Sequence, residues 1–200
     1  ERAEVPYEEV KLPVMHVKPF TEYGTRESGA APKDVILLHG GNDSYFEELF
    51  FPMLYLAENG FEVYLFEGPG QGGVMRVQGK HFTYEWERPV KAVLDYFALS
   101  DVTIIGASLG GMLAPRAAAF ESRISRVIAW SIFPNFQDVL LSASQGAGTR
   151  QFKLAKKLIS MHCRSIVNLV FRKKAEKDEM VRWGLEHGKY AYEAKDAYGY

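Results

Sequence analysis

The 200-residue chain lacks several features that would place it outside the ordinary globular proteins. It has a single cysteine, Cys163, which excludes an internal disulfide and favours a reducing compartment, so a cytoplasmic location is expected. No apolar run approaches the roughly 18–20 residues that a membrane helix needs. The formal net charge is −1, so no overall field attracts the protein to nucleic acid or to an anionic membrane.

What is present is a regular alternation of predicted strands and helices. Hydrophobic residues make up 47% of the chain, which is enough for a buried core. Apolar runs typical of strands buried on both faces lie at residues 34–38, 61–66, 102–105 and 126–130. Apolar residues at helical spacing lie at 46–59, 84–99 and 112–120. This alternation predicts an α/β fold with a mostly parallel, doubly wound sheet.

The two ends of the chain depart from that alternation. Residues 7–20 alternate polar and apolar side chains around two prolines, which indicates edge strands, and residues 22–32 indicate a turn. After Pro134 the sequence predicts helices and loops with many basic residues. We therefore expect a core over residues 1–136 and a helical cap, inserted after a strand of the sheet, over residues 137–200.

Residues 106–111, with the sequence GASLGG, fit the G-x-S-x-G pattern of a nucleophile elbow. A serine hydroxyl is a poor nucleophile unless it is held exposed beside a base, and a sharp turn from strand to helix exposes it in this way. A predicted strand precedes Ser108 and a predicted helix follows it, so the required context is present. Ser108 is therefore the predicted nucleophile.

Two backbone amides near Ser108 are expected to stabilise negative charge in an oxyanion hole. The first is the N–H of Leu109, at the start of the following helix. The second is expected from the HGG segment at residues 39–41, which follows the 34–38 strand. We assign it to Gly41, with Asn42 as the neighbouring candidate. His39 is interpreted as ordering this loop, in preference to a role as catalytic base.

Three segments together resemble the α/β-hydrolase superfamily: HGG at 39–41, FEGPGQG at 66–72 and GASLGG at 106–111. The GPGQG segment is similar to the branch that contains 2,6-dihydroxypseudooxynicotine hydrolase and the fermentation-respiration switch-type esterases. The resemblance covers residues 7–136 and implies a serine hydrolase without metal or organic cofactor. Glu67 stands where the family usually has aspartate, and that residue is structural in the family. Members of the branch often carry a helical cap.

The rest of the catalytic triad is not evident. The fold orders its triad as serine, acid, histidine, and the family usually places the last two after its seventh and eighth strands. After Ser108 the only histidines are His162 and His187, both in helix-like polar sequence. Asp138 is the candidate acid, with a first-turn or N-cap position of a cap helix as the alternative.

We therefore expect this sequence to be part of a longer protein that carries the missing strands and histidine, with a shortened inactive relative as the alternative. The favoured function is hydrolysis of a small ester, amide or activated C–C bond. A noncatalytic binding protein on the same scaffold is the competing hypothesis. The expected partner is a small-molecule substrate, with a homodimer as a possible assembly and no nucleic acid or membrane.

A dinucleotide-binding site was the third hypothesis, because residues 68–73 match G-x-G-x-x-G after a strand. Pro69 within the turn, and the lack of an apolar helical stripe directly after it, argue against pyrophosphate binding.

Overall fold

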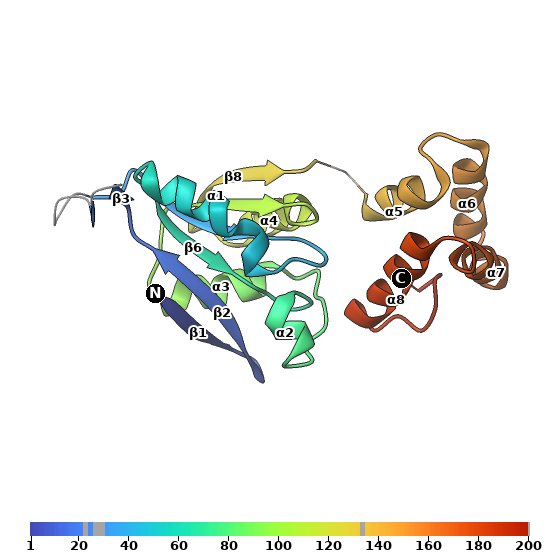
Figure 1. Ribbon diagram of the computed structural model, residues 1–200, viewed down its shortest axis with the longest axis horizontal. Helices are drawn as coiled ribbons and strands as arrows, with labels where there is room; N and C mark the ends of the chain where they lie inside the picture. The colour runs from blue at the N-terminus through green and yellow to red at the C-terminus, as the bar shows by residue number, and fades with distance from the viewer. Residues whose placement is uncertain (22–23, 26–30, 133–134, 200) are drawn as a thin grey trace. The chain divides into compact units, whose positions relative to one another are not determined.

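The structure is a computed structural model that describes residues 1–21, 24–25, 31–132 and 135–199 (Figure 1). Two compact units make up the chain, Glu1–Ile132 and Phe133–Tyr200. The turn expected over residues 22–32 falls largely outside the described residues.

The first unit is built on a six-stranded sheet in the order β1-β2-β6-β5-β7-β8. The strands are β1 (Arg2–Tyr7), β2 (Val10–Val17), β5 (Val35–His39), β6 (Glu62–Phe66), β7 (Val102–Ala107) and β8 (Ile124–Trp130). The last four are parallel, whereas β1 and β2 form an antiparallel hairpin that continues antiparallel onto β6. A separate two-stranded ladder joins β3 (Phe20–Thr21) to β4 (Gly24–Thr25). The α/β class is therefore confirmed, with a mixed sheet.

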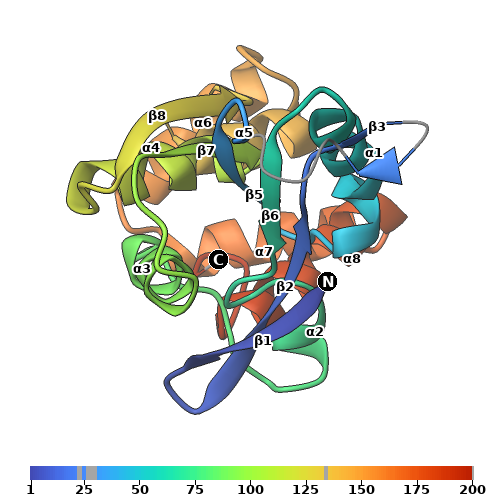
Figure 2. The same cartoon turned by 90° about the vertical axis from the view of Figure 1, so that its left-hand side faces the viewer.

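Helices cover both faces of this sheet, as Figure 2 shows for α1 and α3. The helices of the unit are α1 (Phe46–Glu58), α2 (Gly72–Arg76), α3 (Glu87–Tyr96) and α4 (Gly110–Phe120). Val63 and Leu65 of β6 share one core cluster with Met53 of α1. Phe66, the next residue along β6, instead lies beside the ring of Trp86, the residue before α3. This alternation is what a strand buried on both faces requires.

Strand β8 ends the sheet within the described part of the chain, and it is poorly covered. Val127, Ile128 and Trp130 are 38%, 50% and 55% exposed. Consecutive side chains of a strand point to opposite faces, so apolar surface is exposed on both faces of β8. An edge of this kind invites pairing with a further strand.

The second unit is helical, with α5 (Phe136–Gln145), α6 (Arg150–Ser160), α7 (Arg164–Ala175) and α8 (Glu179–Ala191) (Figure 1). Side chains of Asn135, Thr149 and Asp178 accept hydrogen bonds from the first turns of α5, α6 and α8. These N-caps explain where the three helices begin. No helix among the described residues is both long and apolar enough to cross a membrane.

Candidate active site

Ser108 lies at the sharp bend that the sequence predicted. Strand β7 ends at the residue before it, α4 begins two residues after it, and its side chain is exposed. Its φ of 56° lies in the left-handed region, which costs a non-glycine residue of order 1–3 kcal/mol. A Cβ atom at Gly106 would lie 2.0 Å from the Gly110 carbonyl oxygen, so only glycine permits this crossing of strand and helix.

The Leu109 amide lies directly beside this serine. Leu109 is the residue just before α4, and the backbone N–H groups at the start of a helix have no acceptor within the helix. None of the described residues accepts a hydrogen bond from it. A Cβ atom built on Gly41 would lie 2.6 Å from this nitrogen and 3.0 Å from the Ser108 Cβ. Glycine at position 41 therefore keeps open the space that Ser108 and the Leu109 N–H share.

The structure corrects the assignment of Gly41 as the second oxyanion donor. Its N–H donates to the Ser44 hydroxyl at 2.8 Å, in a buried turn, and is not directed at a substrate oxygen. Serine side chains close short turns in this way by bonding a nearby backbone amide. Asn42 is half-buried and remains the predicted second donor.

His39 has the surroundings of a structural residue. Its side chain is fully buried between Phe66 and Trp86, with ring centroids 5.4 and 5.2 Å away. Burial lowers its pKa to about 4, so the ring is neutral near pH 7. Its Nδ1 lies 2.9 Å from the Gly40 carbonyl oxygen, which can only accept, so Nδ1 carries the proton and donates. His39 therefore orders the loop that carries Gly41.

Glu67 also holds the site together through backbone groups. Its carboxylate accepts hydrogen bonds from the N–H of Phe46 at 3.1 Å and of Gly73 at 2.8 Å, at the starts of α1 and α2. Burial raises the pKa of this carboxyl group. A side chain that caps two helices at once fits the structural role that the family resemblance implied.

This arrangement also bears on the dinucleotide hypothesis. A short helix, α2, does begin at Gly72, although no apolar helical stripe follows the glycine-rich turn in the sequence. The start of α2 is nevertheless occupied, since the Glu67 carboxylate already takes the N–H of Gly73. A Cβ atom at Gly72 would collide with that carboxylate, so these glycines make room for Glu67. A pyrophosphate would have to displace a buried anion of the protein itself.

The remaining triad candidates belong to the second unit. Asp138 is the third residue of α5, whose N-cap is Asn135, and its carboxylate pairs with Nζ of Lys156 on α6 at 2.9 Å. His162 is exposed after α6. His187 is 6% exposed within α8, with its ring stacked 5.3 Å from that of Trp183. The structure thus brings together Ser108, Leu109 and Gly41, and gives Asp138 a lysine partner.

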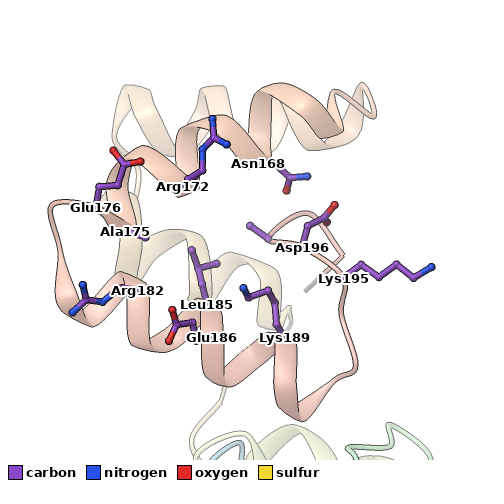
Figure 3. Close-up of a pocket in the computed structure, with 11 residues that line it drawn as sticks. Asn168, Arg172, Ala175, Glu176, Arg182, Leu185, Glu186, Lys189, Lys195 and Asp196 are labelled. Carbon is purple, nitrogen blue, oxygen red and sulfur yellow. The ribbon is translucent and has the colours of Figure 1, made fainter.

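A cavity of about 440 Å³ lies within the second unit, between α7, α8 and residues 195–197 (Figure 3). Its lining mixes cations such as Arg172 and Lys189 with acids such as Glu176 and Glu186. None of the predicted site residues lines it. Among the described residues, no group of three side chains is placed to hold a metal ion.

Two contributors to the site were missed by the sequence analysis, Ser44 and Gln71. Ser44 follows Gly41 by three residues, which is a spacing at which a serine can close a turn. Gln71 stands inside the GPGQG segment, which supported the family resemblance without a role for its glutamine. Its side chain is 1% exposed and contacts the loop that carries Gly41.

A mixed sheet with helices on both faces, an exposed serine in a strained strand-to-helix bend and a glycine loop beside it define an α/β-hydrolase core. The comparison of sequences agrees: residues 35–192 match the profile of the Alpha/beta hydrolase family, and the chain belongs to that family.

Among curated relatives, the chain is similar to the hydrolase acrC of Aspergillus aculeatus, with 31% identity over 211 residues that cover 96% of this chain and 47% of the relative. It is also similar to the 20-hydroxy-prefusarin hydrolase FUS2 of Gibberella moniliformis, with 38% identity over 137 residues that cover 62% of this chain and 32% of the relative.

Among solved structures, the crystal structure of 2,6-dihydroxy-pseudo-oxynicotine hydrolase shares the fold. The TM-score is 0.60 at 23% identity, over 92% of this chain and 46% of that one. The chain thus spans about half the length of acrC and of this hydrolase, and less of FUS2.

Proposed function

We propose that the protein is a serine hydrolase that cleaves a small ester, amide or activated C–C bond through an acyl-enzyme on Ser108. The observation that carries the proposal is the conformation of this serine. It is exposed at a φ of 56°, with the Leu109 N–H beside it and Gly41 leaving the adjacent space open. Strained backbone of this kind persists only where the surrounding structure imposes it, and it concentrates at active sites.

In the proposed mechanism, the Ser108 hydroxyl attacks the substrate carbonyl and a histidine takes its proton. The Leu109 N–H, with Asn42 as the second donor, stabilises the oxyanion that forms. The histidine then protonates the leaving group, and water releases the acyl group by the reverse sequence. We propose that this histidine belongs to the part of the protein that its relatives have beyond the matched half, because His39 is fully buried and its Nδ1 donates to the Gly40 carbonyl oxygen.

The substrate class rests on the relatives and on the proposed cap. One relative is named for hydrolysis of 20-hydroxy-prefusarin, and the fold neighbour for hydrolysis of 2,6-dihydroxy-pseudo-oxynicotine. Both names favour a small organic substrate. We propose that the helices of residues 136–191 act as the cap that selects this substrate, in a cytoplasmic enzyme.

The test is labelling of the full-length protein with a fluorophosphonate probe, together with hydrolysis of a p-nitrophenyl ester. Ser108→Ala should abolish labelling and lower kcat by at least about 10⁴-fold, because no other group replaces the nucleophile. Ser100→Ala is the matched control, since Ser100 is an exposed serine just before the start of β7 and should not matter. Folded wild-type protein that neither labels nor hydrolyses would favour the noncatalytic binding protein instead.

A further inference from the structure

Gln71 is a fully buried polar side chain that the proposed mechanism leaves without a role. It is 1% exposed and stands in the glycine-rich segment between β6 and α2. Burying an amide away from water is unfavourable unless both of its ends find partners. The hydrogen-bond partners of the Gln71 amide therefore indicate which segments this side chain holds in place.

Both ends of the Gln71 amide bind backbone groups in two different loops. Its Oε1 accepts from the Gly68 N–H at 2.9 Å, within its own loop. Its Nε2 donates to the Gly41 carbonyl oxygen at 2.8 Å, in the loop between β5 and α1. The side chain therefore ties the glycine-rich loop to the loop that lies against Ser108.

The Gly41 carbonyl belongs to the same peptide unit as the Asn42 N–H. In a trans peptide the carbonyl and the N–H point in opposite directions, so fixing one fixes the other. The preceding peptide is fixed as well, because the Gly40 oxygen accepts from His39 and the Gly41 N–H donates to Ser44. Two consecutive peptide planes beside the nucleophile are thus held by side chains.

We propose that Gln71 is a positioning residue of the oxyanion hole: its amide orients the Gly41–Asn42 peptide next to Ser108 and so directs the second donor. This inference rests on the proposed serine hydrolase activity. Oxyanion donors act by being held in place before charge develops, so loss of the holding contact weakens the transition state more than substrate binding.

The test compares two variants of the full-length protein in p-nitrophenyl ester hydrolysis. Gln71→Met keeps the length of the side chain and removes both hydrogen bonds. We expect kcat to fall by roughly 10- to 100-fold, the effect of a misplaced catalytic group, with KM changed less than about twofold. Gln71→Glu keeps an acceptor for the Gly68 N–H, but it can donate to the Gly41 oxygen only while its carboxyl group is protonated.

The pH profile of Gln71→Glu gives a readout that a merely structural role would not move. Its kcat relative to wild type at the same pH should rise as the pH falls, because protonation restores the donor. Gln78→Met is the matched control. The Gln78 amide also bridges two backbone groups, the N–H and the carbonyl of Lys11, but on the exposed surface. It should retain wild-type kcat.

Each outcome decides the proposal. A folded Gln71→Met variant with wild-type kcat, or with a raised KM alone, would overturn it. If Gln71→Met does not fold, the Gln71→Glu profile decides, and a kcat ratio that does not change with pH would overturn the proposal. Folded wild-type protein without activity would instead defeat the hydrolase proposal on which this one rests.

Discussion

The two units of the molecule hold their backbone polar groups in different ways. In the first unit, beside the local contacts of His39 and Ser44, two side chains bind backbone groups of distant segments. Gln71 reaches Gly41 across 30 residues, and Glu67 reaches Phe46 across 21. In the second unit the helix caps are local and span two or three residues, although Asn168 also accepts a hydrogen bond from the Tyr198 N–H across 30 residues. The cap pairs are Asn135 with Gln137, Thr149 with Phe152, and Asp178 with Met180.

The difference indicates where a substitution should affect chemistry and where it should affect only local stability. Long-range contacts fix several loops relative to one another, so a change in one is transmitted to the site. Local caps stabilise the first turn of one helix by about 1 kcal/mol and transmit little. The two units also differ in the size of their hydrophobic cores. Within its described residues, the second unit has only three buried hydrophobic side chains: Leu141, Val167 and Ala191.

A pair of glycine substitutions tests this difference with the largest expected effect. Gly41→Ala places a methyl group 2.6 Å from the Leu109 nitrogen and 3.0 Å from the Ser108 Cβ, in the space where the oxyanion would sit. We expect kcat for ester hydrolysis to fall by roughly 10²- to 10³-fold, comparable to the loss of one oxyanion donor. Steady-state kinetics of the full-length variant measures it.

Gly184→Ala is the matched control in the second unit. A Cβ atom at this position in α8 meets no other atom within 4 Å. Alanine in a helix interior is favoured over glycine by about 1 kcal/mol, so this variant should gain thermal stability and keep its kcat. Equal kcat for Gly41→Ala and wild type would contradict the placement of the oxyanion beside Gly41.

The sequence predicted the parts of the fold that depend on local patterns. The apolar run at 34–38 became β5, that at 102–105 became part of β7, and Ser108 lies in the bend between strand and helix. Helix α3 is shorter than the 84–99 segment that the apolar stripe indicated, because it runs from Glu87 to Tyr96. Periodicity identifies the buried face of an element more reliably than its ends.

What the sequence could not show depends on contacts between distant segments. Helix α2 forms in a stretch that begins with two glycines, where propensity disfavours a helix, because the Glu67 carboxylate caps it. Edge strands were expected only from residue 7 onward, so most of β1 (Arg2–Tyr7) was missed. This strand forms because it pairs with β2 in the hairpin. The Ser44 hydroxyl that accepts from the Gly41 N–H is the exception, because this contact is local and its three-residue spacing was available in the sequence.

The second prediction uses the buried His39 of the first unit. In the unfolded chain this imidazole becomes protonated below about pH 6.5, whereas burial lowers its pKa to about 4 in the folded protein. Acidification from pH 6.5 to 4 therefore favours the unfolded state, by about 3 kcal/mol for this group. His39→Asn cannot titrate, so its free energy of unfolding should fall less over this interval.

Denaturant unfolding of the wild-type and variant proteins at several pH values measures the difference. His162→Asn removes an exposed histidine of the second unit and is the matched control. Parallel pH profiles for wild type and His39→Asn would mean that His39 is solvated or charged in the folded protein, and its role in ordering the loop would have to be abandoned.

The smallest effect is expected at Asp138, the candidate triad acid in the second unit. Its carboxylate pairs with Lys156, and both side chains are substantially exposed, at 36% and 42%. An exposed ion pair contributes about 0.2–1 kcal/mol to stability, whereas loss of the acid of a catalytic triad lowers kcat by about 10⁴-fold. We expect Asp138→Asn to lower the unfolding free energy by less than about 1 kcal/mol and to leave kcat within about twofold.

Lys156→Met separates the two roles of Asp138, because it breaks the ion pair and leaves the carboxylate in place. If the pair is only a link between α5 and α6, the two single variants lose similar stability and the double variant loses little more. A large fall in kcat for Asp138→Asn, with Lys156→Met unaffected, would instead make Asp138 the acid that orients the catalytic histidine. Residues of the second unit would then take part in the chemistry, and the division between a catalytic core and a helical unit without catalytic residues would fail.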